Sequence, residues 1–90
     1  MWGFGMSRKK HETLVHIIAD VLRVQGLHPE VDVEYQRGQL DVRCGGIYYE
    51  VKCNMNKYAF EKGQNQIYRA MQWKQARKGV IVTYDGVYEV

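Results

Sequence analysis

The chain has 90 residues, of which 46% are hydrophobic and 26% charged, and its net charge is +3. A chain of this length forms one domain and buries only roughly 60–65% of its unfolded surface, so a partner subunit would help to stabilise it. The composition excludes a largely disordered chain, and no apolar run approaches the roughly 20 residues that cross a bilayer. The start "MWGFGMSRKK" does not have the pattern of a signal peptide. We therefore expect a cytoplasmic protein with an N-terminal arm (residues 1–6), a single domain (residues 7–90) and no membrane association.

The first half of the chain predicts one helix and three strands. The helix covers residues 7–25, with Ser7 as its N-cap and Gly26 after its end. Its apolar stripe comprises Leu14, Ile17, Ile18, Val21 and Gln25, with Val15 and Leu22 at the flanks. Residues 31–35 alternate between apolar and acidic side chains, as in a half-buried strand. Residues 40–44 and 47–52 predict a hairpin around Gly45 and Gly46.

The second half predicts a helix and two strands. Asn56 is the expected cap of a helix that runs to about Arg77 and is closed by Gly79. The apolar run "GVIVTY" (79–84) is typical of a strand buried on both faces, and an Asp85–Gly86 turn leads into a last strand, residues 87–90. A right-handed crossover through the helix makes the 79–84 strand parallel to the strand that carries Glu50. The predicted fold class is α/β (α+β mixed), a small mixed sheet with a helix on each side.

The two cysteines, Cys44 and Cys53, fall at opposite ends of the predicted hairpin. Strands advance roughly 3.3 Å per residue, so this spacing is too long for a disulfide. We expect both to be reduced, as in a cytosolic protein.

The register of the hairpin brings two acids together. A two-residue turn at Gly45–Gly46 sets Asp41 directly opposite Glu50, with Cβ atoms roughly 5 Å apart. Alternation then gives an apolar face and a polar face. The apolar face has Leu40, Val42, Cys44, Ile47, Tyr49, Val51 and Cys53, and the polar face has Gln39, Asp41, Arg43, Tyr48, Glu50 and Lys52.

Facing carboxylates destabilise a hairpin unless a cation offsets their repulsion. Two carboxylates, a backbone carbonyl and waters commonly hold Mg²⁺, and Lys52 on the same face can reach a metal-bound water or a phosphate oxygen. The alternative is the solvated face of an amphipathic hairpin, in which Arg43 and Lys52 neutralise the acids.

Asp41 followed by "EVK" (residues 50–52), between an N-terminal helix and a basic helix, resembles the PD-(D/E)XK nuclease superfamily. The resemblance extends from about Ser7 to Tyr84, with Leu40 in place of the motif proline. It implies a restriction-endonuclease-like αβββαβ core and hydrolysis of DNA phosphodiester bonds with Mg²⁺ or Mn²⁺. Asp41, Glu50 and the carbonyl of Val51 would hold the metal, and Lys52 would act on the attacking water.

Two further elements follow from this resemblance. Some branches of the superfamily carry a glutamate in the first helix that joins the metal site; Glu12 matches by position, a solvated glutamate is the alternative, and Glu34 is a rival third carboxylate. Gln64 and Tyr68 share a helix face and are similar to the Gln-x-x-x-Tyr element of RecB-like exonucleases and to the helix glutamine of VRR-NUC-type nucleases. The resemblance implies that Gln64 orients the water or the scissile phosphate.

The segment 57–78 contains six basic residues and one acidic residue, Glu61, which indicates either a DNA-binding surface or a solvated helix face. The expected DNA contacts are Lys57, Lys62, Tyr68, Arg69, Lys74 and Arg77. Arg8, Lys9 and Lys10 form a second basic cluster. Because phosphate contacts carry no sequence information, we expect a structure- or end-directed enzyme.

Two alternatives remain open. The compact layout also resembles archaeal Holliday-junction resolvases, which act as dimers, so a homodimer is expected. Small stand-alone nucleases of this kind often belong to phages, archaeal viruses or plasmids. The alternative of a different class is a non-catalytic DNA-binding module on the same fold.

Overall fold

A computed structural model describes residues 2–54 and 56–90 of the chain, with side chains described from residue 9 onward except for residue 55. The elements are α1 (Trp2–Val24), β1 (Glu30–Tyr35), β2 (Gly38–Cys44), β3 (Ile47–Val51), α2 (Lys57–Gln72), β4 (Lys78–Thr83) and β5 (Gly86–Glu89). The strands form one sheet in the order β1-β2-β3-β4-β5, in which the β3–β4 pair is parallel and the other pairs are antiparallel. The predicted mixed sheet with one parallel pair is confirmed. Among the described residues, no helix is long and apolar enough to cross a bilayer.

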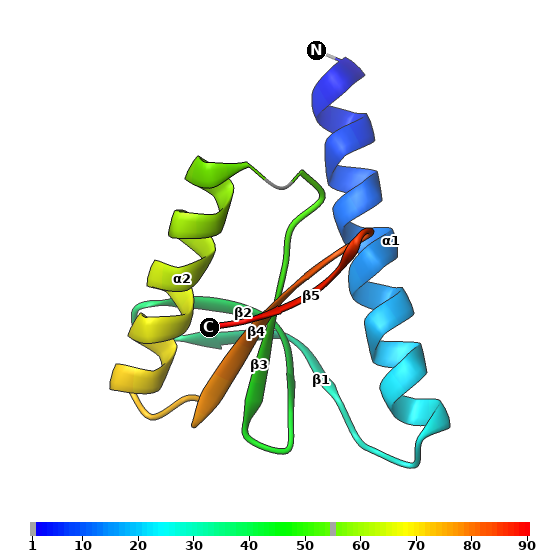
Figure 1. The fold of residues 1–90 in the computed structure, drawn as a ribbon. Coiled ribbons are helices and arrows are strands. Elements are labelled where there is room, and N and C mark those ends of the chain that lie inside the picture. Colours follow the sequence, from blue (N-terminus) through cyan, green and yellow to red (C-terminus); the bar gives the residue numbers. More distant parts are fainter. Residues whose placement is uncertain (1, 55) are drawn as a thin grey trace.

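Two apolar clusters hold the helices on opposite faces of the sheet, as Figure 1 shows. The α1 side buries Leu14, Val15, Ile18, Leu22, Val42, Cys44, Val51, Val80 and Val82. The α2 side buries Leu40, Tyr48, Ile67, Ala70, Ala76 and Ile81. The sheet is therefore covered on both faces, and the hairpin face that was expected to be polar packs beneath α2.

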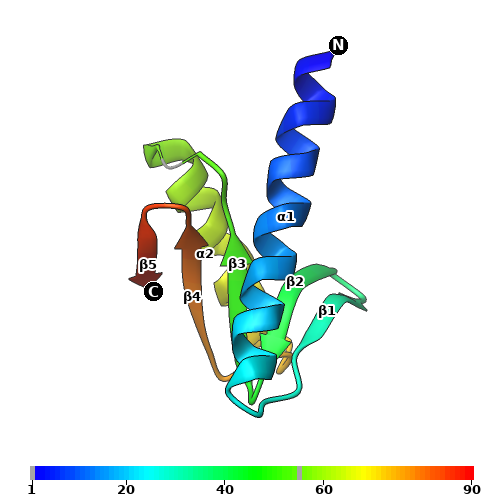
Figure 2. The same ribbon diagram turned by 90° about the vertical axis from the view of Figure 1, so that its right-hand side faces the viewer.

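Helix α1 is longer than predicted and is rotated about its axis. It begins at Trp2, so Ser7 lies inside the helix rather than at its cap, and the helix runs across the predicted boundary between arm and domain. Figure 2 shows that its first turns extend beyond the end of the sheet. Ile17 and Val21 are 46% and 51% exposed, whereas Ala19 is fully buried. The predicted stripe was wrong at Ile17 and Val21. Apolar residues occupy a broad part of the α1 surface, and only the side that packs on β1, β2 and β3 is buried.

The alternation of β1 and β2 is interrupted next to Asp41. Asp32 has a positive φ of 54°, and the regular pairing of Val31 with Val42 and of Val33 with Leu40 does not include it. Val31 consequently packs on the α1 side and Val33 on the α2 side. Leu40 lies on the α2 side as well, which corrects its predicted place on the face of Val42.

The hairpin turn is confirmed. Cys44 pairs with Ile47, and Gly45 and Gly46 have φ values of 58° and 80°, which a two-residue turn of this type requires. Cys44 and Cys53 are free thiols, as predicted.

Helix α2 has the predicted start but an earlier end. The Asn56 side chain accepts a hydrogen bond from the Ala59 N–H at 2.8 Å, which confirms the cap. The helix ends at Gln72 rather than near Arg77, and Lys74 has a positive φ of 58° just beyond it. Gly79 does not close the helix but lies in β4.

The last turn also differs by one residue from the prediction. Thr83 pairs with Gly86, so the turn consists of Tyr84 and Asp85.

Candidate functional site

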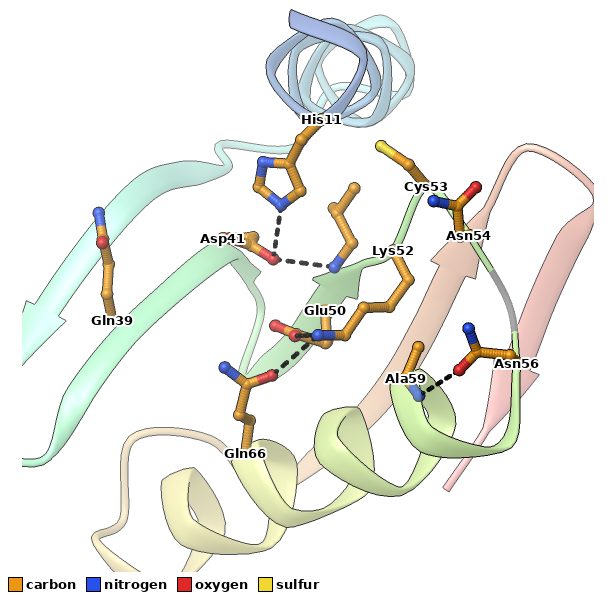
Figure 3. A pocket seen from close by; sticks show the side chains of 11 residues that line it. His11, Gln39, Asp41, Glu50, Lys52, Cys53, Asn54, Asn56, Ala59 and Gln66 are labelled. Atoms are coloured by element: carbon orange, nitrogen blue, oxygen red, sulfur yellow. Dashed lines mark hydrogen bonds and ion pairs between the residues drawn. The ribbon is translucent and has the colours of Figure 1, made fainter. Parts of the chain in front are cut away.

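A cavity of about 540 Å³ opens where α1, the end of β3 and the start of α2 meet (Figure 3). It is lined by His11, Gln39, Asp41, Glu50, Val51, Lys52, Cys53, Asn54, Asn56, Ala59 and Gln66. The structure therefore brings the three motif residues of the hairpin into one cavity. The crossover from β3 to α2 forms one wall because the parallel β3–β4 pair forces the chain to leave the sheet at this end.

The two carboxylates are positioned by the hairpin register. The regular pairing of β2 with β3 ends at Val42 and Tyr49, and Asp41 and Glu50 are the residues that follow at this end of the ladder. The Asp41 carboxylate replaces part of the strand ladder, because its Oδ2 accepts a hydrogen bond from the Val51 N–H at 2.9 Å. This bond fixes the side chain of Asp41 against the end of β3.

Glu50 is a buried acid with an unusual environment. Its side chain is only 4% exposed. Burial, reinforced by the negative charge of Asp41, raises the pKa of Glu50 to about 7. The Tyr48 hydroxyl donates a hydrogen bond to Oε1, and Lys52 Nζ lies 3.1 Å from Oε2. Glu50 is therefore not on a solvated face, but Lys52 does pair with it, as that alternative expected.

Tyr48 was expected on a polar face and is instead fully buried under α2. Burial, together with the neighbouring Glu50 charge, raises the pKa of its hydroxyl, so Tyr48 remains a hydrogen-bond donor to Glu50. An aromatic ring on the same strand face as an acid, two residues away, was the sequence signal for this pairing.

Lys52 connects the acids to α2. Its Nζ donates a hydrogen bond to Gln66 Oε1 at 3.3 Å, and Figure 3 shows Gln66 reaching toward Lys52 from α2. Gly63 lets α2 pack close to β4, since a Cβ there would lie 3.0 Å from Ile81 Cδ1.

The glutamine at the cavity is Gln66, and Gln64 is not among the lining residues. Gln64 and Tyr68 follow Phe60 at four-residue spacing, and the Phe60 ring packs edge-on against Tyr88 of β5. They therefore occupy the flank of α2 near β5, away from the carboxylates. A helical wheel anchored on the buried Gly63, Ile67 and Ala70 would have favoured Gln66 over Gln64.

His11 is a site residue that the sequence analysis missed. Its Nε2 lies 3.4 Å from Asp41 Oδ2, and this contact raises the pKa of His11. In turn, although burial raises the pKa of Asp41, the hydrogen bonds from His11 and from the Val51 N–H hold it below its usual range. The available signal was its position one helical turn before Leu14 and Val15, on the buried side of α1.

The two candidates for a third carboxylate lie outside this cavity. Glu12 is exposed and borders a neighbouring cavity of about 440 Å³, which shares His11, Gln39 and Asp41 with the first. Glu34 is exposed in β1, where it pairs with Gln39, and it lines neither cavity.

The predicted DNA-binding residues do not form one patch. Lys57 and Lys62 are exposed on the first half of α2, nearest the cavity, and Lys9 and Lys10 are exposed on α1. Arg77 lies at the opposite end of the sheet, where its Nη2 donates to the Gly45 carbonyl at 3.1 Å. Lys74 borders the same region as Arg77, and Tyr68 is 52% exposed on the β5 flank of α2.

Comparisons with protein-family models, with curated proteins and with solved structures found no match to this chain.

The residues of the cavity were tested for their fit to a divalent cation. Within the described part of the chain, no group of three or more His, Cys, Asp or Glu side chains is arranged to hold a metal. The oxygen donors at this place are the carboxylate of Asp41, the carboxylate of Glu50, which already contacts Tyr48 and Lys52, and the backbone carbonyl of Val51. Mg²⁺ is commonly bound through one or two carboxylates together with waters and substrate phosphates, so this set fits an open Mg²⁺ site. A buried carboxylate with a raised pKa beside a second carboxylate is an environment that a cation would stabilise.

Proposed function

We propose that the protein is a Mg²⁺- or Mn²⁺-dependent deoxyribonuclease with a restriction-endonuclease-like core of the PD-(D/E)XK type. The observation that carries the proposal is the meeting of Asp41, Glu50 and Lys52 in one cavity, with Glu50 almost fully buried. Burial disfavours the ionised form of a carboxylic acid, and a bound cation would stabilise that form. We place its action inside the cell, on DNA.

Each side chain has a distinct part in this proposal. When bound between Asp41 and Glu50, the metal would supply Lewis-acid stabilisation of a phosphate oxygen. Lys52 would place its ammonium next to the attacking water and the charge that builds on the phosphate. Tyr48 orients Glu50, while the Val51 N–H orients Asp41. Gln66 holds Lys52 from the α2 side. The role predicted for Gln64 was a different one, to orient the water or the scissile phosphate.

The second candidate is a non-catalytic DNA-binding module. It is favoured by the closed contacts of Glu50, whose two oxygens already have partners in Tyr48 and Lys52. These contacts stabilise the buried carboxylate of Glu50 without a cation. In that case Glu50 would serve the stability of the hairpin and not catalysis.

A homodimer remains part of the proposal, as in a resolvase-like enzyme that acts on branched DNA. Its support is the exposed apolar flank of α1, where Ile17, Val21 and Val24 are 46%, 51% and 87% exposed.

The deciding experiment is incubation of the purified protein with linear, circular, single-stranded and four-way-junction DNA in Mg²⁺, Mn²⁺ or EDTA. We expect cleavage that requires the metal and that Glu50→Ala abolishes. Glu61→Ala, which removes an exposed glutamate of α2, is the matched control and should cleave normally. Absence of cleavage for every substrate and metal would leave the DNA-binding module as the function.

A further inference from the structure

The flank of α2 that faces the β1–β2 turn carries an aromatic and arginine cluster. The Arg37 guanidinium lies 5.0 Å from the centroid of the Trp73 ring, and Trp73 is 38% exposed. Arg69 Nη1 donates a hydrogen bond to the Arg37 carbonyl at 3.4 Å, which ties the turn to the helix. The cluster thus presents a flat ring and two arginines at the surface.

This cluster is continuous with the candidate active site. Gln66 and Arg69 of α2 and Trp73, the C-cap of this helix, are separated by three and four residues, so they follow one flank of the helix. Gln66 at one end of this row contacts Lys52, and Trp73 at the other end contacts Arg37. Seven residues of helix span about 10 Å, which is enough for a few nucleotides of an unpaired strand.

The two segments that form this surface carry only positive charge, and the exposed Glu34 of β1 lies beside the turn, where it pairs with Gln39. Neither the turn segment 36–39 nor the segment 62–78 contains an acidic residue, and both contain arginine. A track of basic side chains with an exposed aromatic ring is complementary to a nucleic-acid strand whose bases are unpaired, because every base has a face that stacks. In duplex DNA the bases are already stacked on one another, so an aromatic side chain on the protein surface adds little.

We propose that the row from Gln66 to Trp73 binds a single-stranded segment of nucleic acid, with one base stacked on the Trp73–Arg37 pair. This inference rests on the proposed nuclease function and specifies its substrate class: DNA with an unpaired tail or flap that leads away from the scissile phosphate. Arg69 contacts the backbone of that tail, and Arg37 adds a cation–π contact on the ring.

The test uses the fluorescence of Trp73. The chain has two tryptophans, so Trp2→Phe leaves Trp73 as the single reporter, and Glu50→Ala in EDTA prevents cleavage. We expect that a ten-nucleotide oligo(dT) quenches the emission of Trp73 and that inorganic polyphosphate of similar charge does not. Equal quenching by both would show an anion site without base contact and would overturn the proposal, as would no quenching by either.

Affinities of variants in the Glu50→Ala background give the second readout. Trp73→Ala should weaken oligo(dT) binding about ten-fold but change binding of a ten-base-pair duplex by less than about two-fold, while Trp73→Phe retains most of the affinity. Arg37→Ala should weaken oligo(dT) binding more than Arg23→Ala, which removes an exposed arginine from α1. An equal loss of single-strand and duplex binding in Trp73→Ala would overturn the stacking role.

The two proposals fail in different ways. Metal-dependent cleavage by the wild-type protein, with neither quenching nor an effect of Trp73→Ala, would refute the track and leave the nuclease standing. Quenching by oligo(dT), with no cleavage of any DNA by the wild-type protein, would refute the nuclease and leave the track as a single-strand binding surface.

Discussion

Glu50 is the residue on which the proposed chemistry depends, and both its burial and the neighbouring Asp41 disfavour its ionised form. It is buried at the end of β3, faces Asp41, and has a pKa raised to about 7. Tyr48 and Lys52 compensate for only part of the cost of ionising it. Near pH 7 both the protonated and the ionised form of Glu50 are therefore populated.

The first prediction concerns Glu50→Gln. Removing one of two facing charges should raise the free energy of unfolding in EDTA at pH 8 by about 1–3 kcal/mol, since a shift of one pKa unit corresponds to about 1.4 kcal/mol. The same variant should lose DNA cleavage. Thermal unfolding measured beside the Glu61→Gln control would check the stability; a lower melting temperature for Glu50→Gln would contradict the facing geometry.

The second prediction concerns pH and metal. The pKa of Glu50 is about 7 in the folded protein, compared with 4.5 for an ordinary glutamate in the unfolded chain. The folded state therefore binds the proton of Glu50 more tightly than the unfolded state does. The contribution of Glu50 to stability is therefore fully present below about pH 4.5 and is lost as pH rises through about 7. We expect Mg²⁺ to raise the melting temperature of the wild-type protein at pH 8 and to leave Glu50→Gln much less changed. Equal Mg²⁺ effects on both proteins would place the cation elsewhere.

At the scale of elements, the position of α2 on the sheet is set by small residues. Gly63 and Gly79 let α2 approach β3 and β4, and a Cβ on Gly79 would lie 2.4 Å from Ile67 Cγ2. Because α2 carries Gln66, its distance from the sheet determines whether Gln66 reaches Lys52.

The third prediction is that Gly79→Ala destabilises the protein by about 1–3 kcal/mol, because Ile67 must move in a packed core. Urea unfolding measures this directly. Gly38→Ala is the control, since a Cβ there meets the Tyr35 ring at an ordinary 3.7 Å. Similar costs for the two variants would mean that α2 is not held by close contact at Gly79.

At the scale of the whole molecule, the positive charge is divided between the two ends of the sheet. Lys57 and Lys62 lie on the half of α2 that begins at the cavity, whereas Arg77 is engaged with the Gly45 carbonyl at the far end. The net charge of +3 is thus distributed so that only part of it can serve one DNA segment.

The fourth prediction follows from this division. In the Glu50→Ala background, DNA affinity should fall steeply with salt, and Lys57→Ala or Lys62→Ala should each reduce the slope of log affinity against log salt by about 1. Arg77→Ala should leave the slope unchanged for a short DNA. Binding isotherms at several salt concentrations measure the slopes. A larger effect of Arg77→Ala than of Lys62→Ala would place the DNA at the other end of the sheet.

The sequence by itself determined the order of elements, the parallel β3–β4 pair and the meeting of Asp41, Glu50 and Lys52. These features depend on local rules: a glycine pair sets the hairpin turn, and a right-handed crossover makes β4 parallel to β3. Alternation gave the faces of β3 but failed at Leu40 in β2. Only the tertiary structure decided that Glu50 is buried, that His11 contacts Asp41 and that Gln66 rather than Gln64 reaches Lys52. The rotation of a helix about its axis follows from which of its side chains pack best against the sheet, and that choice depends on contacts far apart in the chain.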